Sequence, residues 1–138
     1  MKLQLEIITP TKLVLQEEVD EITLPTTSGE ISVLPNHVDL LTKITGGEMI
    51  IRKGGKSDLF AITGGFLEVS KNKVSILADH AIHAGDIEVS KVEEAKQRAE
   101  KAMKEKQTEK DYQLLQDDLR RHVLELKVAR RHKAARAS

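Results

Sequence analysis

The chain has 138 residues, of which 39% are hydrophobic, and its 22 Lys and Arg balance its 22 Asp and Glu. This composition is typical of a globular protein with one or two small domains, and no apolar run reaches the roughly 20 residues that a membrane helix requires. The absence of cysteine excludes disulfides and thiolate metal sites, and the scarcity of aromatic residues argues against a stacking platform for single-stranded nucleic acid.

The first half of the chain has the pattern of an all-β domain. Between Lys2 and Ala78, short runs of apolar and β-branched residues are broken by turn residues about every 8 to 12 positions, as in a sandwich or barrel. The predicted strands span residues 3–9, 12–19, 20–24, 30–34, 39–44, 48–52, 59–63, 66–70 and 73–77.

Turn residues support this division into strands. Gly54–Gly55 and Lys71–Asn72 each lie between two strand patterns and can adopt the positive φ that a tight hairpin demands. We also expect Pro10, Pro25 and Pro35 to lie outside strand interiors, where each would remove a ladder hydrogen bond.

The second half predicts helices. No Gly or Pro occurs after Glu88, and two apolar stripes recur there at spacings typical of a helix face. The first stripe comprises Val92, Ala95, Ala99 and Ala102, and the second comprises Leu115, Leu119, Leu126 and Ala129. A polar run separates them, with a turn near Gln107 and Thr108 as the N-cap of the second helix, so the region is interpreted as an antiparallel helical hairpin. The predicted fold is therefore α+β in two domains, an antiparallel β-sandwich or flattened barrel over residues 1–85 and a hairpin over residues 86–138.

The predicted hairpin has a weak seam and a basic end. Burying an alanine methyl contributes roughly 0.8 kcal/mol against about 1.5 to 3 kcal/mol for a leucine, so we expect the hairpin to open easily and to act as a switch. Residues 1–85 carry 8 Lys and Arg against 11 Asp and Glu, whereas residues 86–138 carry 14 against 11. The excess gathers at Arg120, Arg121, Lys127, Arg130, Arg131, Lys133 and Arg136, which predicts a helix that meets an acidic surface.

Three possible chemical sites give weak signals. Gly55-Lys56-Ser57 resembles the end of a phosphate-binding loop, but the Gly required five residues earlier is Ile50 and no helix follows. Asp79, His80 and His83 could ligate a divalent metal, although a polar connector between the domains is the favoured interpretation. Nucleic-acid binding by the basic helix is disfavoured by the neutral total charge.

His37 raises the question of a catalytic base. It follows Pro35 and Asn36 in a predicted turn, and only Glu30 and Asp39 are nearby carboxylates. Because no serine or cysteine nucleophile accompanies it, we expect a docking residue rather than an enzyme active site. The sequence predicts no metal and no cofactor.

Several segments, taken in order, resemble the epsilon subunit of the F-type ATP synthase, bacterial type. They are GEISVLPNH at residues 29–37, LL at 40–41, Gly47, ITGGFLEV at 62–69 and VSILAD at 74–79. The resemblance spans the whole chain and implies a non-catalytic subunit of the central stalk that couples c-ring rotation to the catalytic head. It also implies a peripheral location on the cytoplasmic face of the bacterial plasma membrane, reached only through the complex.

The resemblance further implies partners and contact residues. The sandwich would pack on the gamma subunit and stand on the c-ring through Glu30, Asn36 and His37. The hairpin would fold down or extend toward the alpha and beta subunits, where its basic helix inhibits ATP hydrolysis. The residues implied to meet an acidic segment of the beta subunit are Arg120, Arg121, Lys127, Arg130 and Arg131.

Some family members bind ATP at the start of the first helix through Ile or Leu, Asp, two variable residues, Arg and Ala. The matching residues here are Ile87, Glu88, Lys91 and Val92, and Lys in place of Arg loses a bidentate fork. We therefore expect weak ATP binding or none. The alternative function that the residues allow is a free-standing adaptor whose hairpin docks a partner coiled coil.

Overall fold

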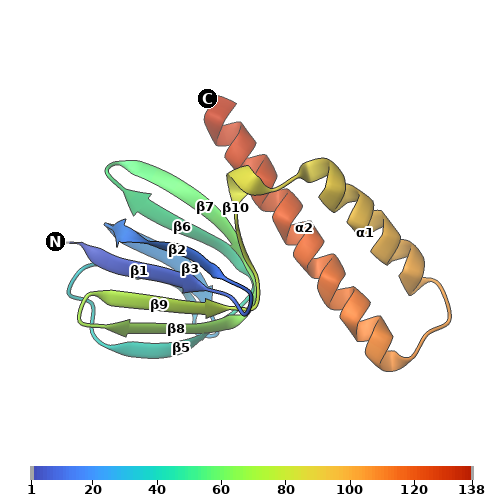
Figure 1. Cartoon of the computed structure of the whole chain (residues 1–138), viewed down its shortest axis with the longest axis horizontal. Coiled ribbons are helices and arrows are strands. Elements are labelled where there is room, and N and C mark those ends of the chain that lie inside the picture. Colours follow the sequence, from blue (N-terminus) through green and yellow to red (C-terminus); the bar gives the residue numbers. More distant parts are fainter. Residues whose placement is uncertain (1, 138) are drawn as a thin grey trace. The chain divides into compact units, whose positions relative to one another are not determined.

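A computed structural model describes residues 2–137, and the side chains of residues 2–135, so the side chain of Arg136 lies outside the described part. The chain divides into two compact units between His83 and Ala84. The first contains ten strands and the second contains the helices, in agreement with the predicted fold class (Figure 1).

The first unit is a ten-stranded sheet that folds into a nearly closed sandwich. Its strands are β1 Leu3–Ile8, β2 Leu13–Val19, β3 Glu21–Thr26, β4 Gly29–Val33, β5 Leu40–Ile44, β6 Gly47–Lys53, β7 Lys56–Ile62, β8 Gly65–Ser70, β9 Lys73–Ala78 and β10 Ala81–His83. They follow the order β10-β7-β6-β3-β5-β8-β9-β1-β2, with β4 paired to β3. All pairings are antiparallel except β1 with β9, which is parallel.

Alternation along the strands builds the core. In β9 the side chains of Val74, Ile76 and Ala78 are buried, because every second residue of a strand faces the same side. The same rule holds for Leu67 and Val69 of β8. Seventeen buried side chains, all from the strands, form one hydrophobic cluster.

The predicted tight turns are confirmed. Lys53 pairs with Lys56 across Gly54 and Gly55, whose φ values are 58° and 77°. Lys71 and Asn72 likewise have φ values of 50° and 64° between Ser70 and Lys73. Positive φ at both central residues gives the turn twist that matches two antiparallel strands.

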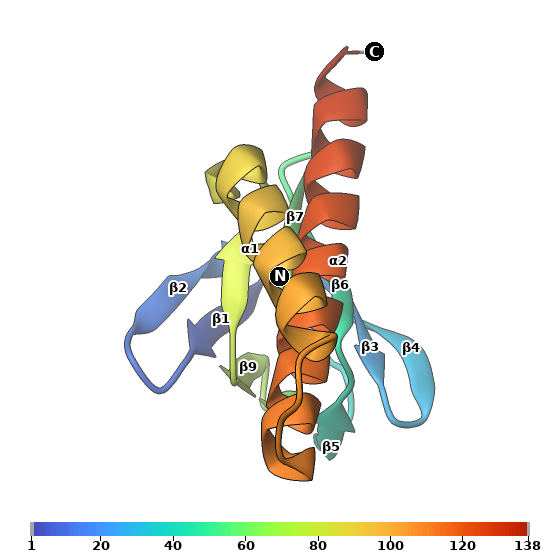
Figure 2. The same cartoon turned by 90° about the vertical axis from the view of Figure 1, so that its right-hand side faces the viewer.

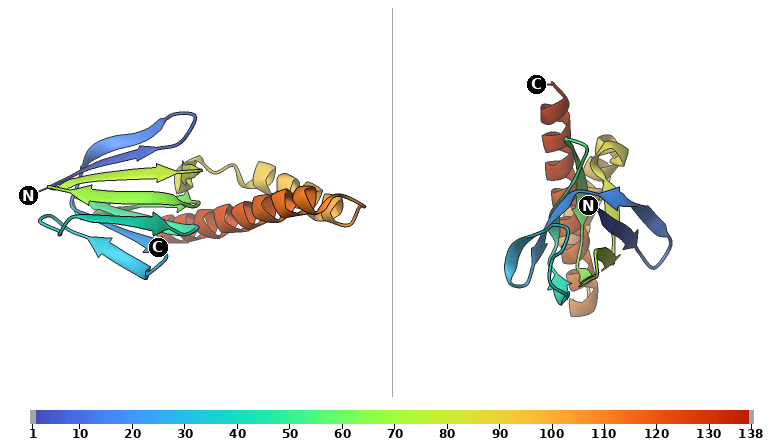
Figure 3. Two further views of the ribbon diagram at one scale, coloured as in Figure 1. Left: turned by 90° about the horizontal axis from the view of Figure 1, so that it is seen from below. Right: turned by 90° about the vertical axis from the view of Figure 1, so that its left-hand side faces the viewer.

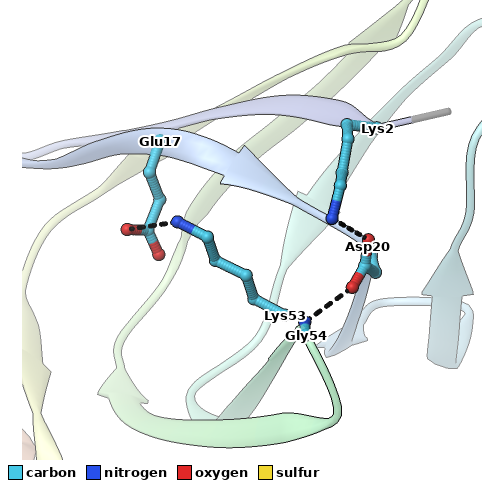
Figure 4. Close-up of polar contacts among 5 residues, drawn as sticks. All are labelled: Lys2, Glu17, Asp20, Lys53 and Gly54. Carbon is cyan, nitrogen blue, oxygen red and sulfur yellow. Dashed lines mark hydrogen bonds and ion pairs between the residues drawn. The ribbon is translucent and has the colours of Figure 1, made fainter.

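A polar clamp fixes the end of the sandwich where the chain begins (Figure 4). The Asp20 carboxylate accepts a hydrogen bond from Lys2 Nζ at 2.7 Å and another from Gly54 N at 2.8 Å. The Lys2 bond, followed by the Gly54 amide, lowers the pKa of Asp20 below its ordinary value. Lys53 reaches Glu17 at 3.7 Å, so β1, β2 and the β6–β7 turn are tied together.

Two sequence predictions about the strands are wrong. Pro25 lies inside β3. On one side of β3 the neighbouring strand is β6 as far as Thr23 and β5 at Thr26, so Pro25 falls in the interval between these two pairings. The missing N–H of a proline is tolerated at such an interruption of the ladder. His83, interpreted with Asp79 and His80 as a polar connector, instead belongs to β10 on the edge of β7.

The second unit begins with a short 3-10 helix, η1 Ala84–Asp86, and continues with α1 Val89–Met103 and α2 Glu109–Ala137. Thr108 Oγ1 accepts a hydrogen bond from Asp111 N at 3.1 Å, which confirms the predicted N-cap. The helices lie side by side and antiparallel (Figures 2 and 3). At 1.5 Å per residue, α1 is about 22 Å long and α2 about 43 Å, so α1 covers only part of α2.

Candidate functional site

The outer face of the sandwich carries a row of apolar side chains. Cross-strand register aligns Lys43 of β5 with Phe66 of β8, Phe66 with Leu77 of β9, and Leu77 with Ile8 of β1. Phe66 is 51% exposed and Leu77 is 52% exposed. Leu41, two residues before Lys43 and therefore on the same face, is 70% exposed. We call Lys43, Phe66, Leu77, Ile8 and Leu41 the apolar face.

A depression of about 480 Å³ adjoins this face at the ends of its strands. It is lined by Ile8, Thr9, Pro10, Lys43, Gly64, Gly65, Phe66, Leu77, Ala78 and Asp79. Gly65 permits the close approach of β8 and β9 there, because a Cβ at this position would collide with the carbonyl of Leu77 and lie 2.8 Å from Ala78 Cα.

An acidic row runs beside the apolar one. Register aligns Leu41 with Glu68, Glu68 with Ser75, and Ser75 with Glu6. Ser75 Oγ donates a hydrogen bond of 2.8 Å to Glu6 Oε1. Exposed apolar side chains with a charged margin are typical of a protein–protein contact rather than of a reaction centre.

The loop of Asn36 and His37 is held by backbone contacts. Asn36 has φ of 68°, and its N–H donates to Asn72 Oδ1 at 2.6 Å, which joins the β4–β5 loop to the β8–β9 turn. His37 N donates to Leu34 O at 3.1 Å, and His37 Nδ1 lies 2.7 Å from Val38 O. The His37 ring thus contacts a carbonyl, whereas a general base would contact a nucleophile.

The structure does not bring Glu30 to this loop, although the sequence predicts that Glu30, Asn36 and His37 form one compact polar surface. Glu30 pairs with Pro25 beside the β3–β4 turn, at the first end of β4. Asn36 and His37 follow its other end, and the three residues from Glu30 to Val33 alone span about 10 Å. Glu30 and His37 therefore belong to opposite ends of the sandwich.

The five predicted basic contact residues lie on α2 in different environments. Arg121, only 28% exposed, lies 3.6 Å from Glu125 and 3.8 Å from Asp118 on its own helix. Arg120, 73% exposed, lies 3.7 Å from Asp117. Lys127, Arg130 and Arg131 are exposed. Of the five, Arg121 alone is not classed as exposed.

At the start of α1, the residues of the predicted weak ATP site contact each other. Lys91 Nζ lies 2.8 Å from Glu88 Oε2, and this hydrogen bond raises the pKa of Lys91 above its ordinary value. Ile87 is only 8% exposed. A nucleotide would have to displace the Glu88–Lys91 pair before either side chain could bind it.

No group of three or more His, Asp or Glu side chains in residues 2–135 could hold a metal ion. His83 Nε2 lies 3.3 Å from Asp58 Oδ1, and its ring meets Phe60 edge-on at 5.2 Å, so it packs β10 against β7. In the same part of the chain, no helix has the length and apolar character needed to cross a membrane.

Sequence reasoning missed the apolar face. Its signal was readable in two strands, because alternation with the buried Leu67 and Ile76 assigns Phe66 and Leu77 to the outside. A large apolar side chain at an outward position is an exception to the usual pattern of antiparallel sheets. Only the register, however, shows that Phe66 and Leu77 are neighbours.

Comparisons with known proteins agree with the fold and with the resemblance drawn from the sequence. Residues 2–84 match the family described as ATP synthase, Delta/Epsilon chain, beta-sandwich domain. Residues 86–130 match ATP synthase, Delta/Epsilon chain, long alpha-helix domain.

Similar chains and structures extend over nearly the full length. The ATP synthase epsilon chain of Herpetosiphon aurantiacus is 42% identical over 130 residues, with 94% of this chain and 96% of that one covered. That of Geobacter sulfurreducens is 40% identical over 136 residues, with 98% and 97% covered. In the Euglena gracilis mitochondrial ATP synthase, one chain matches with TM-score 0.64 and 24% identity over 97% of this chain and 81% of its own. A chain of the Tetrahymena thermophila central stalk and c-ring matches with TM-score 0.63 and 18% identity over 94% and 97%. These two structural likenesses show a shared fold, whereas the family matches and the bacterial identities show descent: the chain belongs to the delta/epsilon chain family of ATP synthase.

Proposed function

We propose that this chain is a non-catalytic subunit of the central stalk of a bacterial ATP synthase. In this role it couples the rotation of the c-ring to the catalytic head and restrains ATP hydrolysis through its helical hairpin. It is a peripheral part of the complex, on the cytoplasmic face of the plasma membrane, and acts on no substrate of its own.

The apolar face is the observation that carries this proposal. Phe66, Leu77 and Leu41 are each at least half exposed in the isolated chain, and a depression of about 480 Å³ lies beside them. Burial of such a patch by a partner contributes roughly 25 cal/mol for each Å² of apolar surface removed from water. We assign this face to the gamma subunit.

The c-ring contact implied by the resemblance includes residues from both ends of β4. Glu30 lies at one end, and Asn36 and His37 follow the other. We propose that one end stands on the c-ring and that the other meets a different part of the stalk. Glu30→Gln and His37→Ala should then affect different steps, one c-ring binding and the other gamma binding, in pull-down assays with each partner.

The basic helix accounts for the proposed restraint of hydrolysis. Arg120, Lys127, Arg130 and Arg131 are exposed on α2, and we propose that they meet an acidic segment of the catalytic beta subunit when the hairpin opens. ATP is not expected to regulate this opening, because Lys91 stands where ATP-binding relatives have Arg and lacks its bidentate fork. Calorimetry should give no heat of binding at micromolar ATP.

The experiment is an ATPase assay of the catalytic complex with four forms of the chain. The intact chain should inhibit hydrolysis, whereas a chain ending at Gly85 should bind equally well and not inhibit. Phe66→Glu should lower the affinity for gamma at least tenfold and thereby remove inhibition at the same concentration. Val89→Glu is the matched control. Val89 is 41% exposed and is the first residue of α1, where a carboxylate is favourable.

Equal inhibition by the intact and shortened chains would remove the role given to the hairpin. Unchanged gamma binding by Phe66→Glu would remove the role given to the apolar face. Elution of the intact chain with an unrelated coiled coil, and without gamma, would support the adaptor function in place of the stalk function.

A further inference from the structure

The hairpin has an apolar groove beside the seam between its helices. The groove has a volume of about 490 Å³ and is lined by Met103 of α1 and by Gln116, Leu119, Arg120, Val123, Leu124 and Lys127 of α2. Most of these α2 residues recur at spacings of three and four, so they lie on one face of that helix, which shares Leu119 with the seam. Val123 is 48% exposed.

Two cations stand at the rim of this groove. Arg120 and Lys127 are seven residues apart on one face, about 10 Å along the helix axis, with Val123 and Leu124 between them. Arg120 lies 3.7 Å from Asp117, and both side chains are more than 70% exposed, so this ion pair is weak. Among the described residues, Lys127 forms no ion pair. Both cations are therefore available to an anion.

The groove is open and its lining is mostly apolar. A stable protein interface buries about 800 Å² on each partner, which is more than this groove offers. Met103 adds a flexible, polarisable floor that adapts to apolar ligands of different shape. An apolar floor with two cations at its rim is complementary to an anionic amphiphile.

We propose that this groove binds a single-chain anionic amphiphile, with its alkyl chain against Met103, Leu119 and Val123 and its head group between Arg120 and Lys127. Because α1 supplies Met103 and α2 supplies the rest, the complete groove exists only while the hairpin is closed. A ligand of this site therefore stabilises the closed hairpin by mass action. If the proposed inhibitory role of the open hairpin is correct, such a ligand also relieves inhibition.

The first test is calorimetric titration of the intact chain with hexanoate, octanoate and decanoate below their micelle concentrations. The dissociation constant should fall roughly fourfold with each added methylene. Heptylammonium, which has the same seven-carbon alkyl chain and the opposite charge, should bind at least tenfold more weakly than octanoate. Equal binding of the two would overturn the assignment of the cationic rim.

Variants locate the site without disturbing the fold, because the substituted side chains are exposed. Arg120→Gln with Lys127→Gln should weaken octanoate binding roughly tenfold or more, since two charge-assisted contacts are lost. Val123→Gln should weaken it through loss of the apolar floor. The matched control is Arg130→Gln with Lys133→Gln, which removes two exposed cations of α2 outside the groove. Equal affinities for the two double variants would overturn the proposal.

Amide hydrogen exchange tests closure separately from any effect on ATPase activity. Some α1 amides exchange only when the hairpin opens. At octanoate concentrations tenfold above the dissociation constant, the exchange of these amides should slow about elevenfold, because the ligand binds only the closed hairpin. Binding without slower exchange would overturn the requirement for both helices.

The oligomeric state gives a further test. A dimer that forms with increasing concentration and is abolished by Val123→Gln would assign the groove to a second copy of the chain and overturn the proposed amphiphile site. Octanoate binding and slowed exchange without relief of inhibition would refute the inhibitory role and leave the site intact.

Discussion

The sandwich and the hairpin are stabilised by very different amounts of buried apolar surface. Among the described residues, 18 of the 24 buried hydrophobic side chains lie between Leu3 and Ala78, and the other six lie between Ala84 and Ala129. In the sandwich these are mostly Leu, Ile and Val joined by ladders between distant segments, whereas α1 contributes only Ala99. From this difference we expect the hairpin to open at a lower free energy than the sandwich.

The largest expected effect is in the sandwich core. Leu67→Ala should lower the free energy of unfolding by about 2 to 5 kcal/mol, because Leu67 has no exposed surface and its removal leaves a cavity. Urea denaturation measures this change. Leu115→Ala, on the half-buried stripe of α2, should leave the unfolding of the sandwich nearly unchanged and accelerate exchange within the hairpin. If Leu67→Ala and Leu115→Ala lowered the free energy of global unfolding equally, the contrast between the sandwich and the hairpin would be wrong.

Two neighbouring glycines give the next test. Gly65→Ala should destabilise the sandwich by about 1 to 3 kcal/mol or more, because the new Cβ meets backbone atoms of Leu77 and Ala78. Gly64→Ala is the control, since its Cβ would lie 3.6 Å from Ile44 O in ordinary contact. Thermal unfolding of both variants measures the difference, and similar melting temperatures would show that β8 and β9 can separate at this point.

In the hairpin, Thr108→Ala removes the N-cap of α2. The loss should be about 1 kcal/mol, and Thr108→Ser should retain most of it. Amide exchange of residues 109–112 should accelerate about fivefold in the alanine variant, while the strands should be unaffected. Acceleration in the sandwich as well would indicate that the two units unfold together.

The smallest effect concerns Asp20 and acid. Its folded-state pKa is lowered by Lys2 and then by the Gly54 amide, so its contribution to stability is present above its unfolded pKa of about 3.9 and is lost as the pH falls through the lower folded pKa. Asp20→Asn should therefore be less stable than the parent at pH 7, and the difference should shrink below about pH 4. If the stability difference between Asp20→Asn and the parent did not change with pH, the ionised Asp20 carboxylate would not stabilise the fold.

Local patterns were sufficient to predict most of the fold. Alternation around Leu67 and Ile76 located β8 and β9, and the Gly54–Gly55 and Lys71–Asn72 turns fixed the hairpins. Pairings between distant segments were not predictable in the same way. The three residues of β10 become a strand only through β7, and the parallel pairing of β1 with β9 has no local signal.

The candidate site shows the same division. His37 and Asn36 were correctly placed in a turn, but their separation from Glu30 follows from the direction of β4 through the sheet. The basic residues were visible as a run, yet the pairing of Arg121 with Glu125 and the exposure of Arg120 depend on helix geometry. Neither the depression beside Phe66 nor the groove beside Val123 has a sequence motif, because each is made by segments that meet only after folding.

Native-state amide exchange over the whole intact chain tests the central contrast most directly. Opening free energies for the amides of α1 should be well below those of β8 and β9, and only the latter should match the free energy of global unfolding. Equal opening free energies for α1 and for β8 and β9 would mean that the hairpin opens only when the whole chain unfolds, which would contradict its proposed role as a mobile regulatory element.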